Sequence, residues 1–213
     1  NMGWMHDFLE YMKLDPYFRK YNHTKMNFAM VYAYSENYML VLSHDEVVHL
    51  KCSMIEKMPG SYEEKFKNLM AGYAFMTGHP GKKLLFMGQD FGQHREWSEE
   101  RELDWFLLEK EPNHQLQLFV KELLHLYKSN KCLYEYDCWP EGFEWINADD
   151  GDRSIFSFVR HSASGKNNML FVINFTPVER PDYRVGTTCR RKHTLVLNSD
   201  DKKFGGKGKR RPK

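Results

Sequence analysis

The densest group of residues that could perform chemistry is the run Ser43-His44-Asp45-Glu46-Val47-Val48-His49. It nearly spells the H-E-x-x-H motif of zinc proteases, in which two histidines four positions apart share one face of a helix. His44 and His49 are five positions apart, which separates them by roughly 140° around a helix. This spacing disfavours a metal site, and we expect neither a metal nor another cofactor.

Two further interpretations of this run are compatible with each other. Ser43 and Glu46 have the S-x-x-E spacing of a capping box, so the run could begin a helix. His44 and Asp45 also follow the apolar run YMLVLS, which we expect to be a buried strand that ends near Ser43. Barrels of alternating strands and helices carry their catalytic residues at that end of a strand, so the His–Asp pair is a catalytic candidate.

A polar, aromatic loop from Gln89 to about Pro112 is the second candidate site. Its first part combines carboxylates, amides and rings: Gln89, Asp90, Phe91, Gly92, Gln93, His94, Arg95, Glu96 and Trp97. Such a mixture suits a sugar, because polar side chains bind hydroxyls and aromatic faces stack on the ring. The alternative is that Phe91, Trp97 and Trp105 simply pack beneath a long loop.

The chain up to about residue 130 alternates helical and strand patterns. Helical spacing appears at Met5, Phe8, Leu9 and Met12, at the S-x-x-E box of Ser61 and Glu64 and the apolar positions after it, and at Leu116, Val120, Leu123, Leu124 and Tyr127. Asp15-Pro16 should stop the first helix, and the run at 82–88 should be a strand. Strand–helix alternation of this kind indicates an α/β sheet or barrel, although a closed barrel needs eight strands.

After about residue 130 the pattern changes to strands without helices. We expect a hairpin formed by 143–147 and 154–160 across an Asp-Gly turn, and further strands at 169–175 and 194–199. The sequence therefore predicts an α/β portion at 1–130 and an antiparallel β-domain at 131–213.

Composition excludes several classes of protein. Of the 213 residues, 41% are hydrophobic and 15% aromatic, too apolar for a disordered chain. No apolar run approaches the roughly 20 residues that span a bilayer, and no leader for export is visible. The cysteines, Cys52, Cys132, Cys138 and Cys189, lack metal or redox spacing and suggest reduced thiols in a cytoplasmic protein.

The net charge of +2 arises from the end of the chain. Residues 201–213 hold seven Lys and Arg and one Asp, and the remainder has 24 basic and 28 acidic side chains, a net charge of −4. A basic tail can bind nucleic acid or anionic lipid. Because no folded recognition element accompanies it, we favour a solvated end and expect neither a nucleic-acid nor a membrane partner.

Several motifs together resemble the glycogen (1,4-α-glucan) branching enzymes, a family of the α-amylase superfamily of glycoside hydrolases. They occur in order along nearly the whole chain: NMGWMHDFLEYMKLDP, LSHDEVVH, KMPGSYEEKFKNLMAGYAFMTGHPGKKLLFMGQDFGQHREW, LDWFLL and GFEWI. The resemblance implies the C-terminal part of a (β/α)8 TIM-type barrel at 1–130 and a truncated antiparallel β-sandwich at 131–213. It also implies an α-1,4-glucan or glycogen as the partner, in glycogen biosynthesis. The oligomeric state remains open.

The same resemblance implies roles for individual residues. The family uses an aspartate nucleophile, a glutamate acid/base and a third aspartate that stabilises the transition state, and only the third has a counterpart here, Asp45. His44 matches a histidine that binds the sugar being cleaved, and Trp97 is a candidate for substrate binding. The nucleophile and acid/base segments of the family precede the NMGWMHD stretch, so we expect this chain to be a C-terminal fragment that is inactive alone.

Two positions depart from the family pattern. Leu50 stands where the family generally has glycine, which could alter the turn beyond Asp45, and MGQDF at 87–91 replaces MGNEF or MGEEF, which could change contacts to the acceptor. Two alternatives to a branching enzyme stay open: a glucan hydrolase or debranching relative, and a non-catalytic glucan-binding module.

Overall fold

The first helix, α1, spans Met2–Lys13 and begins at Asn1, whose side chain accepts a hydrogen bond from the backbone N–H of Trp4 at 3.0 Å. Its predicted apolar face is buried, including Met5, Phe8, Leu9 and Met12. Asp15 then caps the short helix α2, Pro16–Arg19, in which Pro16 occupies the first turn. The predicted stop at Asp15-Pro16 is confirmed, because proline is tolerated in the first turn of a helix but not in its interior.

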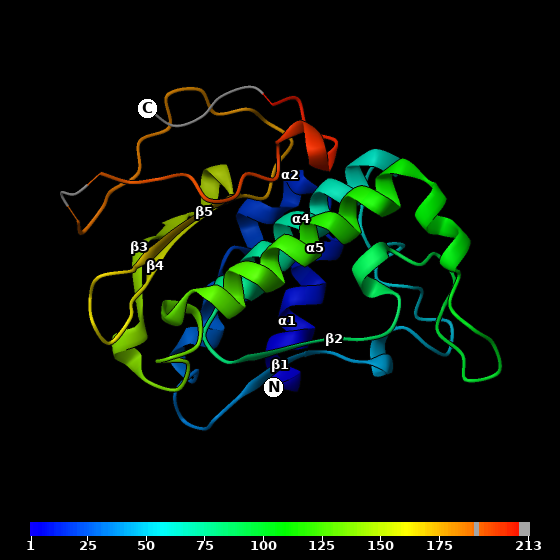
Figure 1. The fold of residues 1–213 in the computed structure, drawn as a ribbon, viewed down its shortest axis with the longest axis horizontal. Helices are drawn as coiled ribbons and strands as arrows, with labels where there is room; N and C mark the ends of the chain where they lie inside the picture. Colours follow the sequence, from blue (N-terminus) through cyan, green and yellow to red (C-terminus); the bar gives the residue numbers. More distant parts are fainter. Residues whose placement is uncertain (190–191, 209–213) are drawn as a thin grey trace.

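A computed structural model describes residues 1–189 and 192–208, and Figure 1 shows how its elements are arranged. After α2 the helices and strands are α3 (Thr24–Asn27), β1 (Met39–Leu42), α4 (Tyr62–Gly78), β2 (Lys82–Leu85), α5 (Glu111–Ser129), β3 (Phe143–Asp150), β4 (Ile155–Arg160) and β5 (Met169–Asn174). Within these ranges, none of the helices combines the length and the apolar character that crossing a bilayer requires.

The capping box predicted for α4 is confirmed. Ser61 Oγ accepts a hydrogen bond from the backbone N–H of Glu64, and the Glu64 carboxylate accepts one from the backbone N–H of Ser61 at 2.7 Å. The other end of α4 lies so close to the three-stranded sheet that a Cβ on Gly78 would meet the Phe158 ring at 2.7 Å. Only glycine allows this approach of helix to sheet.

β1 and β2 form a parallel pair, with Met39 opposite Lys82 and Leu42 opposite Leu85, and α4 connects them. Both predicted strands are present, although each is only four residues long. A TIM barrel is not evident in the described residues, which place no third strand beside this pair. A barrel must close through eight hydrogen-bonded strands.

The strands after residue 130 form an antiparallel sheet in the order β3-β4-β5. The predicted hairpin is confirmed, but a 3₁₀ turn at Gly151–Arg153 joins its strands in place of a two-residue turn. The strand predicted at 194–199 is wrong. Leu195 and Val196 are exposed and only Leu197 packs against the core, so pairing there would bury little apolar surface.

The described part of the basic tail folds back onto the helices. A 3₁₀ turn, Lys202–Phe204, buries the Phe204 ring against Phe119 of α5 with 5.1 Å between centroids. Lys203 and Lys207 pair with Glu122 and Glu179. Residues 209–213 of the predicted solvated end lie outside the described residues.

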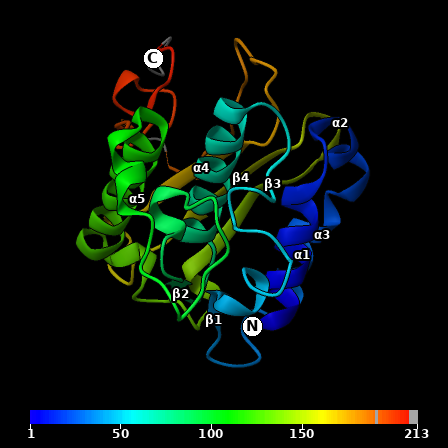
Figure 2. The same ribbon diagram turned by 90° about the vertical axis from the view of Figure 1, so that its right-hand side faces the viewer.

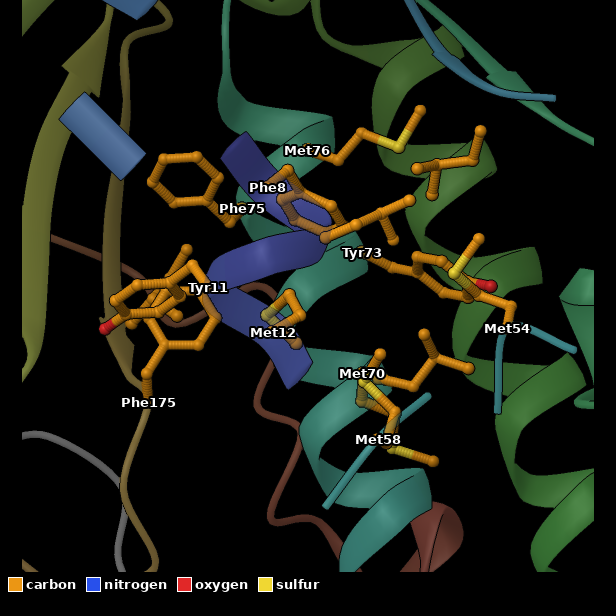
Figure 3. Packing of buried hydrophobic residues seen from close by; sticks show 14 of the residues in the cluster. Phe8, Tyr11, Met12, Met54, Met58, Met70, Tyr73, Phe75, Met76 and Phe175 are labelled. Carbon is orange, nitrogen blue, oxygen red and sulfur yellow. The ribbon is translucent and has the colours of Figure 1, made fainter. Parts of the chain in front are cut away.

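A continuous core joins the helices to the three-stranded sheet. Figure 3 shows its methionine-rich part, with Met12, Met54, Met58, Met70 and Met76 around α1 and α4. Flexible thioether side chains can fill the irregular gaps between helices of different direction.

Aromatic rings complete this core where α1 and α4 meet the sheet. The Phe156 ring lies 5.6 Å from Phe75 and 5.7 Å from Phe175, and Tyr11 lies 5.4 Å from Phe175. Side chains from before and after residue 130 therefore share one interior, and the domain boundary near 130 stays a prediction.

Arg160 of β4 has no exposed surface and binds three segments of the chain. Its guanidinium donates to Asp137 Oδ1 at 2.8 Å, to the Gly142 carbonyl at 3.0 Å and to the Gly78 carbonyl at 3.0 Å. The last of these acceptors is the end of α4. A buried guanidinium is tolerated only when its donors are satisfied in this way.

Asp137 also accepts hydrogen bonds from residues that precede residue 130 in the chain. Lys82, the first residue of β2, lies 3.2 Å from Asp137 Oδ2, and the Tyr127 hydroxyl donates to the same oxygen at 3.0 Å. Burial by itself would raise the pKa of Asp137, but the positive charges of Lys83, Arg160 and Lys82 outweigh it and hold the pKa below its ordinary value.

Replacing Asp137 should therefore destabilise the protein strongly. Asp137→Asn leaves Arg160 as a buried charge without its counter-ion, and we expect it to lower the free energy of unfolding by about 3–5 kcal/mol. The matched control is Glu122→Gln, which removes the exposed pair with Lys203 and should cost less than about 1 kcal/mol. Chemical denaturation measures both, and equal losses in the two variants would contradict the role given to Arg160 and Asp137.

Stability should also depend on pH through His79, which is buried just after α4. Burial lowers the pKa of His79 to about 3, from an ordinary value of 6.5. Because the unfolded chain then binds a proton that the folded one does not, stability is present above pH 6.5 and falls by about 1.4 kcal/mol for each pH unit between 6.5 and 3. His79→Gln removes this proton, so the variant should lose less stability than the wild type between pH 7 and pH 5.

Denaturation midpoints of both proteins at the two pH values measure this difference. Comparing the two proteins cancels the contribution of His23, whose pKa burial also lowers. An identical pH dependence in the variant and the wild type would show that His79 is not held neutral.

Candidate functional site

The candidate site lies where β1 and β2 end. Because the strands are parallel, the segments after Leu42 and after Leu85 leave the pair at the same edge, and Figure 2 shows the two strands side by side. The first segment begins Ser43-His44-Asp45 and the second Phe86-Met87-Gly88. The prediction that the His–Asp pair directly follows a strand is confirmed.

Asp45 lies in a single 3₁₀ turn, His44–Glu46. This turn does not continue into an α-helix. The Ser43 hydroxyl donates to Asp45 Oδ2 at 2.7 Å and makes no hydrogen bond to the backbone of the turn. The interpretation of Ser43 and Glu46 as a helix cap is therefore wrong. Ser43 instead positions the carboxylate of the catalytic candidate.

The surroundings of Asp45 favour its ionised form. The hydrogen bond from Ser43 lowers the pKa of Asp45, and the nearby charges of His44 and Lys51 act in the same direction. About half of the Asp45 side chain is exposed, with His44 Nε2 3.7 Å from Oδ1. Asp45 thus presents a negative charge to solvent at the edge of the strand pair.

Trp97 of the predicted loop joins His44 at this edge. Its ring centroid is 6.3 Å from His44 and 5.1 Å from Phe86, while the Phe86 and His44 centroids are 5.7 Å apart. The backbone N–H of Trp97 also donates to the Val47 carbonyl at 3.1 Å. The structure therefore brings together all three residues singled out in the sequence, Asp45, His44 and Trp97.

Trp97 is half-buried and packs against the core. The sugar-stacking and packing interpretations of this side chain therefore both apply in part, since one portion contacts Phe86 and another reaches solvent. Phe91 is fully buried beneath the loop, whereas Trp105 is about half exposed.

Glu96 belongs to the candidate loop, but the sequence did not reveal the contacts that it makes. Its carboxylate accepts hydrogen bonds from the backbone N–H of Leu50 at 3.0 Å and of Cys52 at 2.6 Å. These bonds fasten the loop that carries Trp97 to the segment that follows Asp45. One acidic residue in a polar loop offers no sequence signal for such a contact across 46 positions.

A second set of contacts, to Asp104, also holds this loop. Arg95 forms an ion pair with the buried Asp104 through two hydrogen bonds, one of them 2.8 Å between Nε and Oδ2. Gln93 accepts a hydrogen bond from the Asp104 backbone N–H at 2.9 Å. The loop beside Asp45 is thus tied at several points although it has little regular structure.

Metal-ligating side chains do not gather at this edge. Among residues 1–189 and 192–208, His, Cys, Asp and Glu form no group of three or more that could hold a metal ion. The groups that Asp45, His44 and Trp97 offer are a carboxylate, an imidazole and an aromatic face, which suit an uncharged polar ligand with several hydroxyls.

The turn after Asp45 is strained at Leu50. His49, Leu50 and Cys52 all have positive φ, and the value of +66° at Leu50 lies in the left-handed region that favours glycine. The Leu50 side chain is 96% exposed, so it contributes no packing in return. This geometry explains why glycine suits the position at which this chain has leucine.

Leu50→Gly should therefore be more stable than Leu50→Ala. Both variants lose the same exposed side chain, and only glycine relieves the contact of Cβ with the backbone, so we expect a difference of about 1 kcal/mol in the free energy of unfolding. Urea denaturation of the two variants measures it. A glycine variant no more stable than the alanine variant would contradict the strained turn.

Comparisons with known proteins place this chain in a family. Residues 145–213 match the family described as "Alpha amylase, C-terminal all-beta domain". The 1,4-alpha-glucan branching enzyme GlgB of Butyrivibrio fibrisolvens is 60% identical over 208 residues, which are 98% of this chain and 33% of that enzyme.

Two further relatives carry the same name. The enzyme of Aquifex aeolicus is 51% identical over 98% of this chain, and that of Halothermothrix orenii is 49% identical over 99%; the match covers 33% of each enzyme. The chain thus spans about a third of the length of these curated relatives. By sequence it belongs to the family of 1,4-alpha-glucan branching enzymes and corresponds to the C-terminal part of their length.

Proposed function

We propose that this chain is the part of a 1,4-α-glucan branching enzyme that supplies one of its three catalytic carboxylates, Asp45. The observation that carries the proposal is the meeting of Asp45, His44 and Trp97 at the common end of two parallel strands. The substrate would be an α-1,4-glucan such as glycogen, and the site would need no cofactor. The cytoplasmic localisation expected from the cysteines belongs to the same proposal.

The architecture we propose extends the strand pair into a barrel. Residues 1–130 would be the C-terminal portion of a (β/α)8 barrel, with β1, α4 and β2 as one of its strand–helix–strand units. Residues 131–213 would belong to a β-sandwich domain that includes the antiparallel sheet. Parallel strands joined by a helix, with chemistry at their C-terminal ends, are the arrangement that such barrels repeat.

The proposed reaction is a double displacement that retains the anomeric configuration. An acid protonates the leaving oxygen while a nucleophile attacks the sugar from the other face, and the two carboxyl groups lie roughly 5–5.5 Å apart. The 6-hydroxyl of another glucan chain then attacks the glycosyl–enzyme intermediate and creates an α-1,6 branch. The nucleophile and the acid/base would come from the part of the relatives' length that this chain does not span.

Asp45 would bind hydroxyls of the sugar at which the bond breaks. Its carboxylate is kept ionised by Ser43 and His44, so its interaction strengthens as positive charge develops on the sugar ring. His44 would hydrogen-bond to the same sugar from the adjacent position. The exposed part of the Trp97 ring would pack against a sugar face.

A chimera with a full-length relative tests the proposal. In the Butyrivibrio fibrisolvens enzyme, the 208 matching residues are replaced by those of this chain, to which they are 60% identical. We expect the chimera to form α-1,6 branches from amylose, measured by the iodine-stain shift and by branch-length profiling. We expect the 213-residue chain alone to be inactive.

Asp45→Ala in the chimera should lower kcat by roughly 100- to 1000-fold or more, because it removes an interaction made in the transition state. The matched control is Asp149→Ala, which removes an exposed aspartate of β3 and should leave kcat unchanged. Equal thermal midpoints of both variants exclude unfolding as the cause. Full activity of the Asp45 variant, or only linear products from the active chimera, would refute the proposal; the latter indicates a hydrolase.

A further inference from the structure

Gln89 is a buried amide directly behind the candidate site. It follows β2 at the start of a 3₁₀ turn, is 4% exposed, and its carbonyl accepts a hydrogen bond from the buried Tyr73 hydroxyl at 2.9 Å. The side-chain oxygen accepts the backbone N–H of Phe86 at 3.3 Å. That contact fixes the orientation of the amide, because only the oxygen can accept.

The other half of this amide is a donor without an acceptor. Gln89 Nε2 is buried and has no hydrogen-bond partner among the residues that the structure describes. An unsatisfied buried donor costs about 1–3 kcal/mol, and native proteins seldom retain one unless water or a ligand satisfies it. The position therefore indicates a group that binds there.

A small cavity is lined in part by Gln89. Its volume is about 10 Å³, the space of about one water molecule, so it accepts a single hydroxyl-sized group. Gln89 and Ser53, each 4% exposed, are polar residues of its lining, while Val47, Met54 and Trp97 provide apolar surface. Apolar walls with a few fixed polar groups are typical of sites that orient a ligand.

The cavity lies next to the strand ends that carry His44 and Asp45. Trp97 lines it and also contacts His44, and Val47 lies two residues after Asp45. Phe86 connects the two sides, since its backbone binds Gln89 and its ring packs against His44 and Trp97. A sugar placed on His44 and Trp97 would therefore lie beside the cavity that Gln89 lines.

We propose that Gln89 is a specificity-determining residue, whose side-chain amide donates to a hydroxyl of the bound glucan or to one water that this hydroxyl anchors. The inference rests on the proposed function, because it takes a glucan as the ligand of the edge. It adds a contact made from inside the fold, on a segment where this chain differs from the usual family pattern. A hydroxyl can accept this hydrogen bond, whereas an apolar group cannot.

The test measures binding of maltoheptaose to the 213-residue chain by isothermal titration calorimetry. Gln89→Glu keeps an acceptor for Phe86 and loses the donor but adds a charge at a buried position, while Gln89→Met removes both polar atoms without adding charge. Either variant should weaken binding roughly 5- to 100-fold, as expected for the loss of one buried hydrogen bond. The matched control is Gln115→Met on α5, whose amide donates to Glu111; it lies outside the cavity and should not change the affinity.

A measurement on the unaltered side chain covers the case in which a variant fails to fold. The Gln89 side-chain NH₂ signal of the wild-type chain, followed by ¹⁵N NMR, should shift when maltoheptaose is added, together with the Trp97 indole signal. An unchanged Gln89 signal while Trp97 shifts, or wild-type affinity in folded Gln89 variants, would overturn the inference. Absence of maltoheptaose binding to the wild-type chain would overturn it as well.

The proposed function is judged separately. Branching by the chimera and its loss in Asp45→Ala do not depend on Gln89. Failure of the Gln89 experiments with an active chimera would therefore remove only the role of Gln89.

Discussion

The structure depends on a buried guanidinium that must find acceptors for its donors. Arg160 has no exposed surface, and its acceptors come from Asp137, from the Gly142 carbonyl and from the end of α4. The same Asp137 binds Lys82, where β2 begins. Lys82 and Leu85, at the two ends of β2, are three residues apart, roughly 10 Å, and the candidate site lies at the Leu85 end.

A second buried arginine, Arg19, also binds acceptors from several segments of the chain. Arg19 of α2 donates to the carbonyls of Met12 and Phe175 and to the Asn68 side chain, each at 2.8 Å. Burial lowers the pKa of Arg19 to about 10, and the Tyr11 ring lies 5.3 Å from its guanidinium. Replacing buried charges by apolar groups can be neutral for stability, so we interpret both arginines as fixing how the sheet sits on the helices.

Local patterns in the sequence predicted most of the elements. Helical spacing in α1, the Ser61–Glu64 box of α4 and the turn signals of the β3–β4 hairpin depend on residues close in sequence, and these predictions are confirmed. The strand expected at 194–199 failed because pairing depends on a distant partner. The contacts of Arg160 could not be foreseen for the same reason, since two of its acceptors are main-chain carbonyls 18 and 82 residues away.

The sequence predicted the part of the site in which reactive side chains directly follow a strand. His44 and Asp45 follow an apolar run, and Trp97 lies in a loop rich in polar and aromatic residues, so composition and position sufficed to single them out. The helix cap assigned to Ser43 was wrong because the same S-x-x-E spacing fits a single turn in which the hydroxyl binds Asp45. The contacts of Glu96 and the orientation of Gln89 required the fold, because each depends on backbone groups rather than on a residue pattern.

The proposed function requires a glucan to bind at the common end of β1 and β2, with Asp45 against the reacting sugar. A crystal structure of this chain with maltoheptaose would show where the glucan binds. We expect a sugar hydroxyl within hydrogen-bonding distance of the Asp45 carboxylate and a sugar ring against His44 and Trp97. Maltoheptaose bound at another surface, such as the exposed rings of Tyr17 and Tyr21, with the Asp45 edge unoccupied, would contradict it.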